Sequence, residues 1–305
     1  MKRLRKRWWA LSLLLWLTAA GMVACWERPV SIFRGYSELR LLLSGAKSHT
    51  VTISQIRVHY YVLGPESGPP VVLVHGLGSR AEDWDHLVPF LVEAGFRVYL
   101  PDLPGYGQSE QPPNFSYSIP DEAGIVVGFL DALGLKQVDM GGWSMGGWIV
   151  QRIAAEHPER VQKLMLFDSA GLYAKPDWNT ALFTPANAEE LTELDDLLMP
   201  NPPKLQAFVI RDILRTSDKN AWVIHRALGS MLSGRDVTDA LLPQLKMPVL
   251  IVWGSVDRIT PLNLGETMHK LIPQSQIEVI EGCGHLAPDQ CAAPIAPGVV
   301  RFLKQ

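Results

Sequence analysis

The segment 142–146 reads Gly-Trp-Ser-Met-Gly and carries the clearest chemical signal in the chain. It directly follows a short apolar run, 137–140, and directly precedes a helical pattern, 148–157. A sharp strand-to-helix turn needs small residues on both sides of its apex, and it lifts a serine hydroxyl above the sheet at a helix N-terminus. Negative charge that develops there is stabilised by free backbone N–H groups. We therefore predict that Ser144 is a nucleophile.

A serine nucleophile needs an adjacent base, because its hydroxyl is a weak nucleophile at neutral pH. His285 ends the Gly-rich segment 281–285, which follows the last predicted strand near the C-terminus. Asp257 follows the predicted strand 249–253 and is the expected acid, which holds the histidine tautomer and stabilises the imidazolium. Asp168, after the preceding strand, is the alternative acid. The order Ser, Asp, His is that of the triad on a strand-turn-helix nucleophile.

Acyl transfer also needs two aimed donors for the oxyanion. The segment 75–78, His-Gly-Leu-Gly, follows the predicted strand 71–74. The N–H groups of Leu77 and of Met145 are the expected oxyanion hole, and Gly76 would let the backbone approach the substrate. His75 is expected to be a buried residue that orders this loop, because His285 is the better base.

The elements that must position these residues alternate between strands and helices from residue 51 onward. Short, wholly apolar runs are typical of strands buried on both faces, so we predict a mostly parallel sheet covered on both sides. No buried strand is predicted between residues 171 and 243, where prolines separate helical pieces; this stretch is expected to be a cap. The predicted cap helices are 186–199, 204–216, 219–232 and 237–245.

Along nearly all of residues 50–305 the chain resembles the α/β-hydrolase superfamily, most of all membrane-anchored monoacylglycerol lipase-like proteins and small bacterial lipases. The resemblance implies an eight-stranded, mostly parallel sheet flanked by helices, with a helical cap at about 172–243, inserted after strand 6. It also implies a Ser144–Asp257–His285 triad and an oxyanion hole at Leu77 and Met145. The residues that carry it are His75-Gly76 with Trp84, 144–147, 169–172, 253–257 and 281–285.

The function implied by the resemblance is hydrolysis of carboxylic esters, of monoacylglycerol or of medium- and short-chain acyl esters, without metal or cofactor. Trp143 departs from these relatives, and its indole is expected to line and narrow the substrate pocket. A carbon–carbon bond hydrolase of the same fold and a catalytically silent ligand-binding homologue remain alternatives. Serine at position 144 excludes relatives that require a carboxylate nucleophile. Four cap residues are expected to roof the acyl site: Leu182, Phe183, Phe208 and Trp222.

The N-terminus reads as a targeting segment, since five basic residues at 2–7 precede the uncharged run 8–24. We predict a signal or anchor segment at 1–25, a juxtamembrane amphipathic stretch at 26–50 and the hydrolase domain at 51–305. The protein would then be membrane-anchored through its N-terminus, with its catalytic domain outside the cytoplasm, on the periplasmic side in a bacterium. Lipidation of Cys25, an uncleaved anchor and simple secretion are all open.

Charge and cysteine content limit the other classes. The net charge is −3, and without the five N-terminal basic residues it is −8, which is unsuited to neutralising nucleic-acid phosphates. Cys283 and Cys291 either pair or remain separate, small hydrophobic residues. Zinc-binding cysteine and histidine spacing is absent. A small acyl ester is therefore the expected partner.

Overall fold

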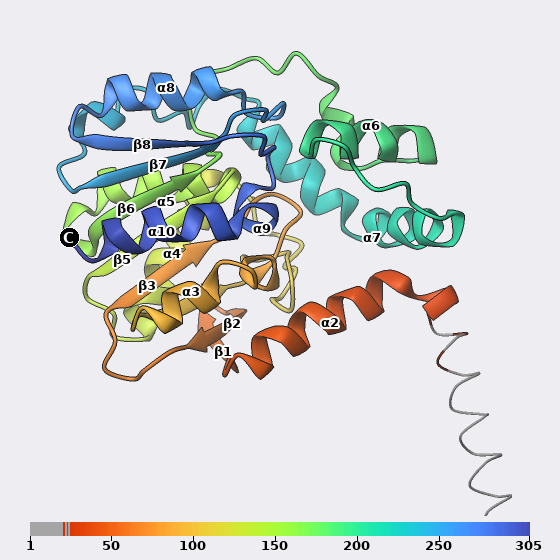
Figure 1. Cartoon of the computed structure of the whole chain (residues 1–305), viewed down its shortest axis with the longest axis horizontal. Coiled ribbons are helices and arrows are strands. Elements are labelled where there is room, and N and C mark those ends of the chain that lie inside the picture. Colours follow the sequence, from red (N-terminus) through yellow and green to blue (C-terminus); the bar gives the residue numbers. More distant parts are fainter. Residues whose placement is uncertain (1–20, 22, 24) are drawn as a thin grey trace, which may run out of the picture.

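The computed structural model describes residues 21, 23 and 25–305 and contains an eight-stranded sheet in the order β1-β2-β4-β3-β5-β6-β7-β8 (Figure 1). The β1–β2 and β2–β4 pairs are antiparallel, whereas strands β3 to β8 run parallel to their neighbours. The strands are β1 (Lys47–Ile53), β2 (Ile56–Leu63), β3 (Pro70–Val74), β4 (Arg97–Pro101), β5 (Val138–Trp143), β6 (Val161–Phe167), β7 (Val249–Gly254) and β8 (Ser275–Ile280). The predicted α/β-hydrolase fold is confirmed.

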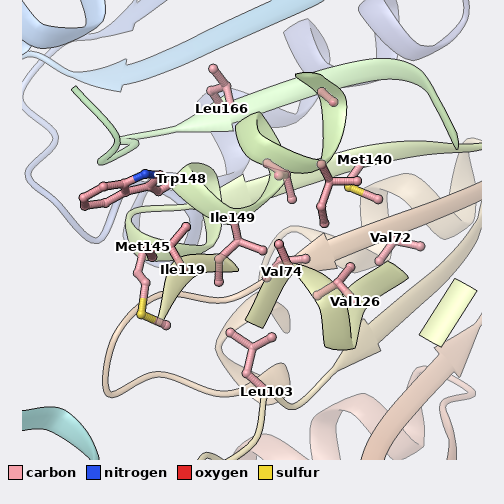
Figure 2. Packing of buried hydrophobic residues seen from close by; sticks show 14 of the residues in the cluster. Val72, Val74, Leu103, Ile119, Val126, Met140, Met145, Trp148, Ile149 and Leu166 are labelled. Carbon is pink, nitrogen blue, oxygen red and sulfur yellow. The ribbon is translucent and has the colours of Figure 1, made fainter. Parts of the chain in front are cut away.

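Helices cover both faces of the sheet, as the apolar strands require. In β3, Val72 and Val74 pack into the hydrophobic cluster with α4, α5 and α8, whereas Val71 and Leu73 pack into the cluster with α3 and α10. Figure 2 shows the first cluster. The helices are α2 (Pro29–Leu43), α3 (Val88–Glu93), α4 (Ile119–Ala132), α5 (Met145–Glu156), α6 (Ala188–Leu198), α7 (Ala207–Met231), α8 (Leu262–Leu271), α9 (Ala287–Gln290) and α10 (Ala292–Leu303), with short 3₁₀ turns η1 (Ala81–Trp84), η2 (Pro158–Arg160), η3 (Thr180–Phe183) and η4 (Leu242–Gln244).

A helical cap lies between β6 and β7, as predicted, but its helices differ from the expected ones. The predicted helices 204–216 and 219–232 form one helix, α7, because neither proline nor glycine interrupts the residues between them. The predicted helix 237–245 contains only the turn η4, which holds Pro243. Thr238 instead donates its N–H to the carbonyl of Gly171, which ties this segment to the end of β6.

Helix α2 runs from the sheet to the cap (Figure 1). Its first turn is capped from α7, because the Val30 N–H donates to Asp212 Oδ2 at 3.0 Å. Trp26 stacks on Phe208 of α7, with ring centroids 4.7 Å apart. The helix agrees with the amphipathic stretch predicted at 26–50, although β1 already begins inside that range, at Lys47.

The predicted membrane localisation, with an extracytoplasmic catalytic domain, is corrected here. Across residues 21, 23 and 25–305, no helix has both the length and the apolar character needed to cross a membrane. Helix α2 has 15 residues and contains Arg34, Glu38 and Arg40, whereas a spanning helix needs about 20 mostly apolar residues. Except for residues 21 and 23, the run 8–24 that motivated the prediction lies outside the described residues. The prediction is therefore withdrawn.

Candidate active site

The strand β5 and the helix α5 meet at Ser144, which has a φ of +55°. This left-handed backbone is strained for a residue with a side chain, and such strain is typical of nucleophile turns. The turn also brings backbones into close contact. A Cβ atom on Gly142 would lie 2.2 Å from the carbonyl oxygen of Gly146, and one on Gly146 would lie 2.2 Å from that of Val74. Glycine is therefore required at both positions.

The structure brings together the serine, histidine and aspartate predicted to act as a triad. His285 Nε2 lies 2.9 Å from Ser144 Oγ, and His285 Nδ1 lies 2.8 Å from Asp257 Oδ2. Asp257 also accepts hydrogen bonds from the N–H groups of Ile259 and Thr260. These donors fix the carboxylate against the imidazole. The arrangement allows proton transfer from Ser144 to His285.

Thr260 is a further polar residue of this site, which the sequence did not single out. Its Oγ1 donates to Asp257 Oδ2 at 2.7 Å and lies 3.2 Å from His285 Nδ1. Its position three residues after Asp257 is the signal that points to it, because a hydroxyl at that spacing can fold back onto the carboxylate.

The alternative acid, Asp168, lies close to Asp257 but in a different role. Its Oδ1 accepts the Gly254 N–H at 2.7 Å, and its buried Oδ2 has no hydrogen-bond partner in the described part of the chain. Burial raises the pKa of the Asp168 carboxyl well above its usual range, and the nearby Asp257 charge raises it further. Both effects favour the protonated form of the Asp168 carboxyl.

The loop expected to form the oxyanion hole lies against the nucleophile. A Cβ atom on Gly76 would be 3.2 Å from Ser144 Cβ, so glycine allows this approach. His75 is buried; its Nδ1 donates to the Gly76 carbonyl, and its Nε2 accepts the Leu103 N–H. Burial lowers the pKa of His75, which keeps the ring neutral, as these two bonds require. His75 orders the loop that presents Leu77, whereas Met145 is the first residue of α5.

The loop that carries His285 is fixed at several points. A disulfide joins Cys283 and Cys291, so the pairing left open by the sequence is present. The Trp143 indole N–H donates to the His285 carbonyl at 2.8 Å. The His285 N–H donates to the carbonyl of Leu198 in the cap at 2.9 Å. Trp143 thus holds the base in place in addition to lining the pocket.

Two cavities meet at Ser144, and both are also lined by Leu77 and Phe183. The smaller has a volume of about 340 Å³, includes Gly76, Trp143 and His285, and reaches Arg34 on α2. The larger, of about 990 Å³, lies between the cap and the sheet. The predicted pocket residues Trp143, Gly76 and Phe183 therefore line a cavity. Arg34 was not predicted, because its helix precedes the domain and carries no motif.

The other predicted roof residues do not line these cavities. Phe208 stacks on Trp26, and Trp222 packs edge-on against Tyr117. Leu182 is buried in a small cluster with Leu197 and Ile259. Of the four apolar roof residues, Phe183 alone lines the two cavities.

One group of metal-type ligands occurs among the described residues, on Asp85, His86 and Asp289. An arginine already occupies it: Arg40 Nη1 lies 2.7 Å from His86 Nε2, and Arg40 Nε lies 3.5 Å from Asp85 Oδ2. The group therefore functions as an ion-pair network that joins α2 to η1 and α9.

Comparison with known proteins agrees with the fold. The family model described as alpha/beta hydrolase fold matches residues 69–229 and 234–290. The chain therefore belongs to the α/β-hydrolase family. Neither the fold nor the family distinguishes ester cleavage from carbon–carbon cleavage.

Particular relatives fall into both of these reaction classes. The chain is 30% identical over 269 residues, 81% of this chain and 91% of the relative, to the 2-hydroxy-6-oxononadienedioate/2-hydroxy-6-oxononatrienedioate hydrolase of Escherichia coli K12. It is 29% identical over 295 residues, 88% and 89% of the two chains, to Lipase 1 of Psychrobacter immobilis. A solved bacterial membrane phospholipase A superposes with a TM-score of 0.82 at 27% identity, covering 98% of each chain.

Proposed function

We propose that this hydrolase cleaves carboxylic esters through an acyl-enzyme on Ser144. The observation that supports this most directly is the continuous hydrogen-bonded series Ser144–His285–Asp257 at the point where two cavities meet. Such a series activates a serine hydroxyl, and a cavity on each side leaves room for both halves of an ester.

The reaction proceeds in two half-reactions. Ser144 Oγ attacks the carbonyl carbon while His285 Nε2 takes its proton, and the N–H groups of Leu77 and Met145 stabilise the oxyanion. Collapse of the tetrahedral intermediate breaks the bond to the alcohol oxygen, which receives the proton from Nε2. Water then attacks the acyl-enzyme, gives its proton to Nε2 and releases the acid, and Ser144 recovers its proton.

The substrates that fit best are monoacylglycerols and other acyl esters of short or medium chain. Apolar side chains such as Trp148, Leu228 and Met231 line the larger cavity and suit a hydrocarbon chain. Its volume is at the upper end of the range of about 300–1,000 Å³ for small-molecule sites. Two proteins to which the chain is similar are named a lipase and a phospholipase A.

The second candidate is carbon–carbon bond hydrolysis by the same triad. It is favoured by a specific observation, the 30% identity over most of the chain to the E. coli dienedioate hydrolase. Both reactions need a serine, a base and an oxyanion hole, so these residues do not distinguish the two reactions. The preferred substrate must be measured.

The deciding experiment measures hydrolysis of p-nitrophenyl esters from acetate to palmitate, of 1-monoacylglycerol and of a vinylogous diketone acid. Wild type is compared with Ser144→Ala and with the matched control Ser233→Ala, which changes an exposed serine after α7. We expect ester cleavage that falls at least about 10⁴-fold in Ser144→Ala and is unchanged in the control. Cleavage of the diketone acid without ester cleavage would favour the second candidate.

A further inference from the structure

The two cavities at Ser144 lie on different sides of the proton-transfer path. His285 and the following Leu286 line the smaller cavity, whereas Ile259 and Thr260 line the larger one. In acyl transfer, the protonated imidazole gives its proton to the leaving group, which must lie within hydrogen-bonding reach of Nε2. The leaving alcohol therefore occupies the smaller cavity, and the acyl chain occupies the larger one.

Polar and charged side chains line the smaller cavity together with apolar ones. They include Ser79, Thr216 and Asn220, the carboxylates Asp83 and Asp195, and Arg34, which reaches the cavity from α2. Polar walls suit an alcohol that carries hydrogen-bonding or charged groups, because an apolar group would leave them without partners.

Arg34 forms no salt bridge in the described part of the chain, although Asp83, Glu82 and Asp212 lie near enough to favour its charged form. Its buried Nε has no hydrogen-bond partner in the described part of the chain. The nearest acids have other partners: Asp83 accepts from the Ser79 hydroxyl and pairs with Arg80 at 4.0 Å. On the other side, Asp212 pairs with Arg215 and accepts the Val30 N–H.

The charge persists under working conditions. Burial, followed by the nearby Arg80, lowers the pKa of Arg34 to about 10, so the guanidinium is protonated at neutral pH. Burial and the nearby Asp196 raise the pKa of Asp195, an acid on the α6 wall, to about 6, so this carboxyl takes up a proton only as the pH falls below neutral.

We propose that the leaving alcohol of the substrate carries an anionic group, a phosphate or a carboxylate, which the Arg34 guanidinium binds in the smaller cavity. A guanidinium donates paired hydrogen bonds to either group, and such charge-assisted bonds are strong when partly buried. This assignment rests on the proposed ester hydrolysis and makes α2, outside the matched family region, part of the substrate site.

The test compares esters that share one medium-length acyl chain and differ in the alcohol: 1-acylglycerol 3-phosphate, the neutral 1-monoacylglycerol and an acyl ester of glycolate. Arg34→Gln is the variant, and Arg40→Gln is the matched control, because Arg40 lies on the same helix but pairs with Asp85 away from both cavities. Thermal melting confirms that each variant is folded.

We expect Arg34→Gln to lower the ratio of kcat/KM for an anionic ester to that for the neutral ester by about 10- to 100-fold. The ratio should stay within about twofold in Arg40→Gln. The ester for which this ratio falls in Arg34→Gln, the phosphate ester or the glycolate ester, identifies the anion that Arg34 binds. An unchanged ratio in Arg34→Gln, with esters still cleaved, overturns the inference alone, whereas a wild type that cleaves none of the esters overturns the proposed function.

Discussion

Asp257 and Asp168 are both buried at the active site, and replacement of each by asparagine should have a different effect on kcat. Asp257 contacts His285, so Asp257→Asn is expected to lower kcat by about 10³- to 10⁴-fold through loss of the correct tautomer. Asp168→Asn should keep kcat within about threefold, because an amide resembles the protonated carboxyl that burial favours there. Steady-state kinetics of both variants on one ester measures the difference. Equal losses would show that Asp168 is ionised or takes part in the reaction.

A different buried acid should make stability depend on pH. Glu122 in α4 is buried, and neither carboxyl oxygen has a hydrogen-bond partner among the described residues. Burial raises the pKa of Glu122 well above the ordinary value of 4.5. The folded state therefore keeps a proton that the unfolded state releases, and stability falls as pH rises from 4.5 through the folded-state pKa, by about 1.4 kcal/mol per pH unit.

Replacing Glu122 by glutamine removes this dependence. Glu122→Gln should match wild type near pH 4.5 and become increasingly more stable than wild type toward pH 8. Urea unfolding at several pH values measures the difference, with Glu66→Gln, which changes an exposed glutamate outside α4, as the control. A difference that does not vary with pH would contradict the pKa assigned to Glu122.

At the residue scale, the chemistry was predictable and the specificity was not. Ser144, Asp257 and His285 each follow a predicted strand and each has a local pattern, so their types and order indicated where they would meet. Arg34 has no pattern of this kind. It reaches the site only because α2 packs across the cap, a contact between distant parts of the chain that single-sequence reasoning does not provide.

Single elements hold the base in place, and the disulfide is the clearest case. Cys283 and Cys291 close a ring that contains His285. Replacing both by serine should lower the free energy of unfolding by about 2–3 kcal/mol, since the ring no longer restricts the unfolded chain. It should also lower kcat, because the His285 loop gains freedom. Denaturant unfolding and ester kinetics measure the two effects.

The free cysteine provides the control for this substitution. Cys25 is exposed and unpaired with the other two cysteines, so Cys25→Ser should change neither stability nor kcat. A double serine variant as stable and active as wild type would show that the disulfide does not support the base.

Elements differ in how well their sequence patterns predicted them. Strands β2 to β8 were predicted because an apolar, β-branched run marks each of them, and β7 matches the predicted strand 249–253 to within one residue. Strand β1 was not predicted, because its residues are mostly polar and exposed. The cap was less predictable. Helix α7 continues through Ser217 and Asp218, which strongly favour neither a helix nor a break. Packing therefore determines that the helix continues there. The segment after it depends on contacts with Gly171 that local sequence does not reveal.

At the scale of the whole molecule, the size of the larger cavity should limit acyl length. Met231 at the end of α7 lines it, so Met231→Trp should shorten the preferred p-nitrophenyl ester by several carbons while short esters are still cleaved. Phe208→Ala, in the same helix but outside both cavities, should leave the preference unchanged. An unaltered chain-length profile in Met231→Trp would place the acyl chain elsewhere.

The crowded backbone at the nucleophile turn has a consequence for laboratory evolution. Codons 142 and 146 tolerate no side chain, because a methyl group at either would overlap a carbonyl oxygen. The hydroxyl of Ser144, in contrast, projects into open space shared by the two cavities. A mutagenesis library that keeps both glycine codons and varies only codon 144 would preserve the turn and sample new reactivity. The same scaffold could thus be evolved from its present reaction to other reactions.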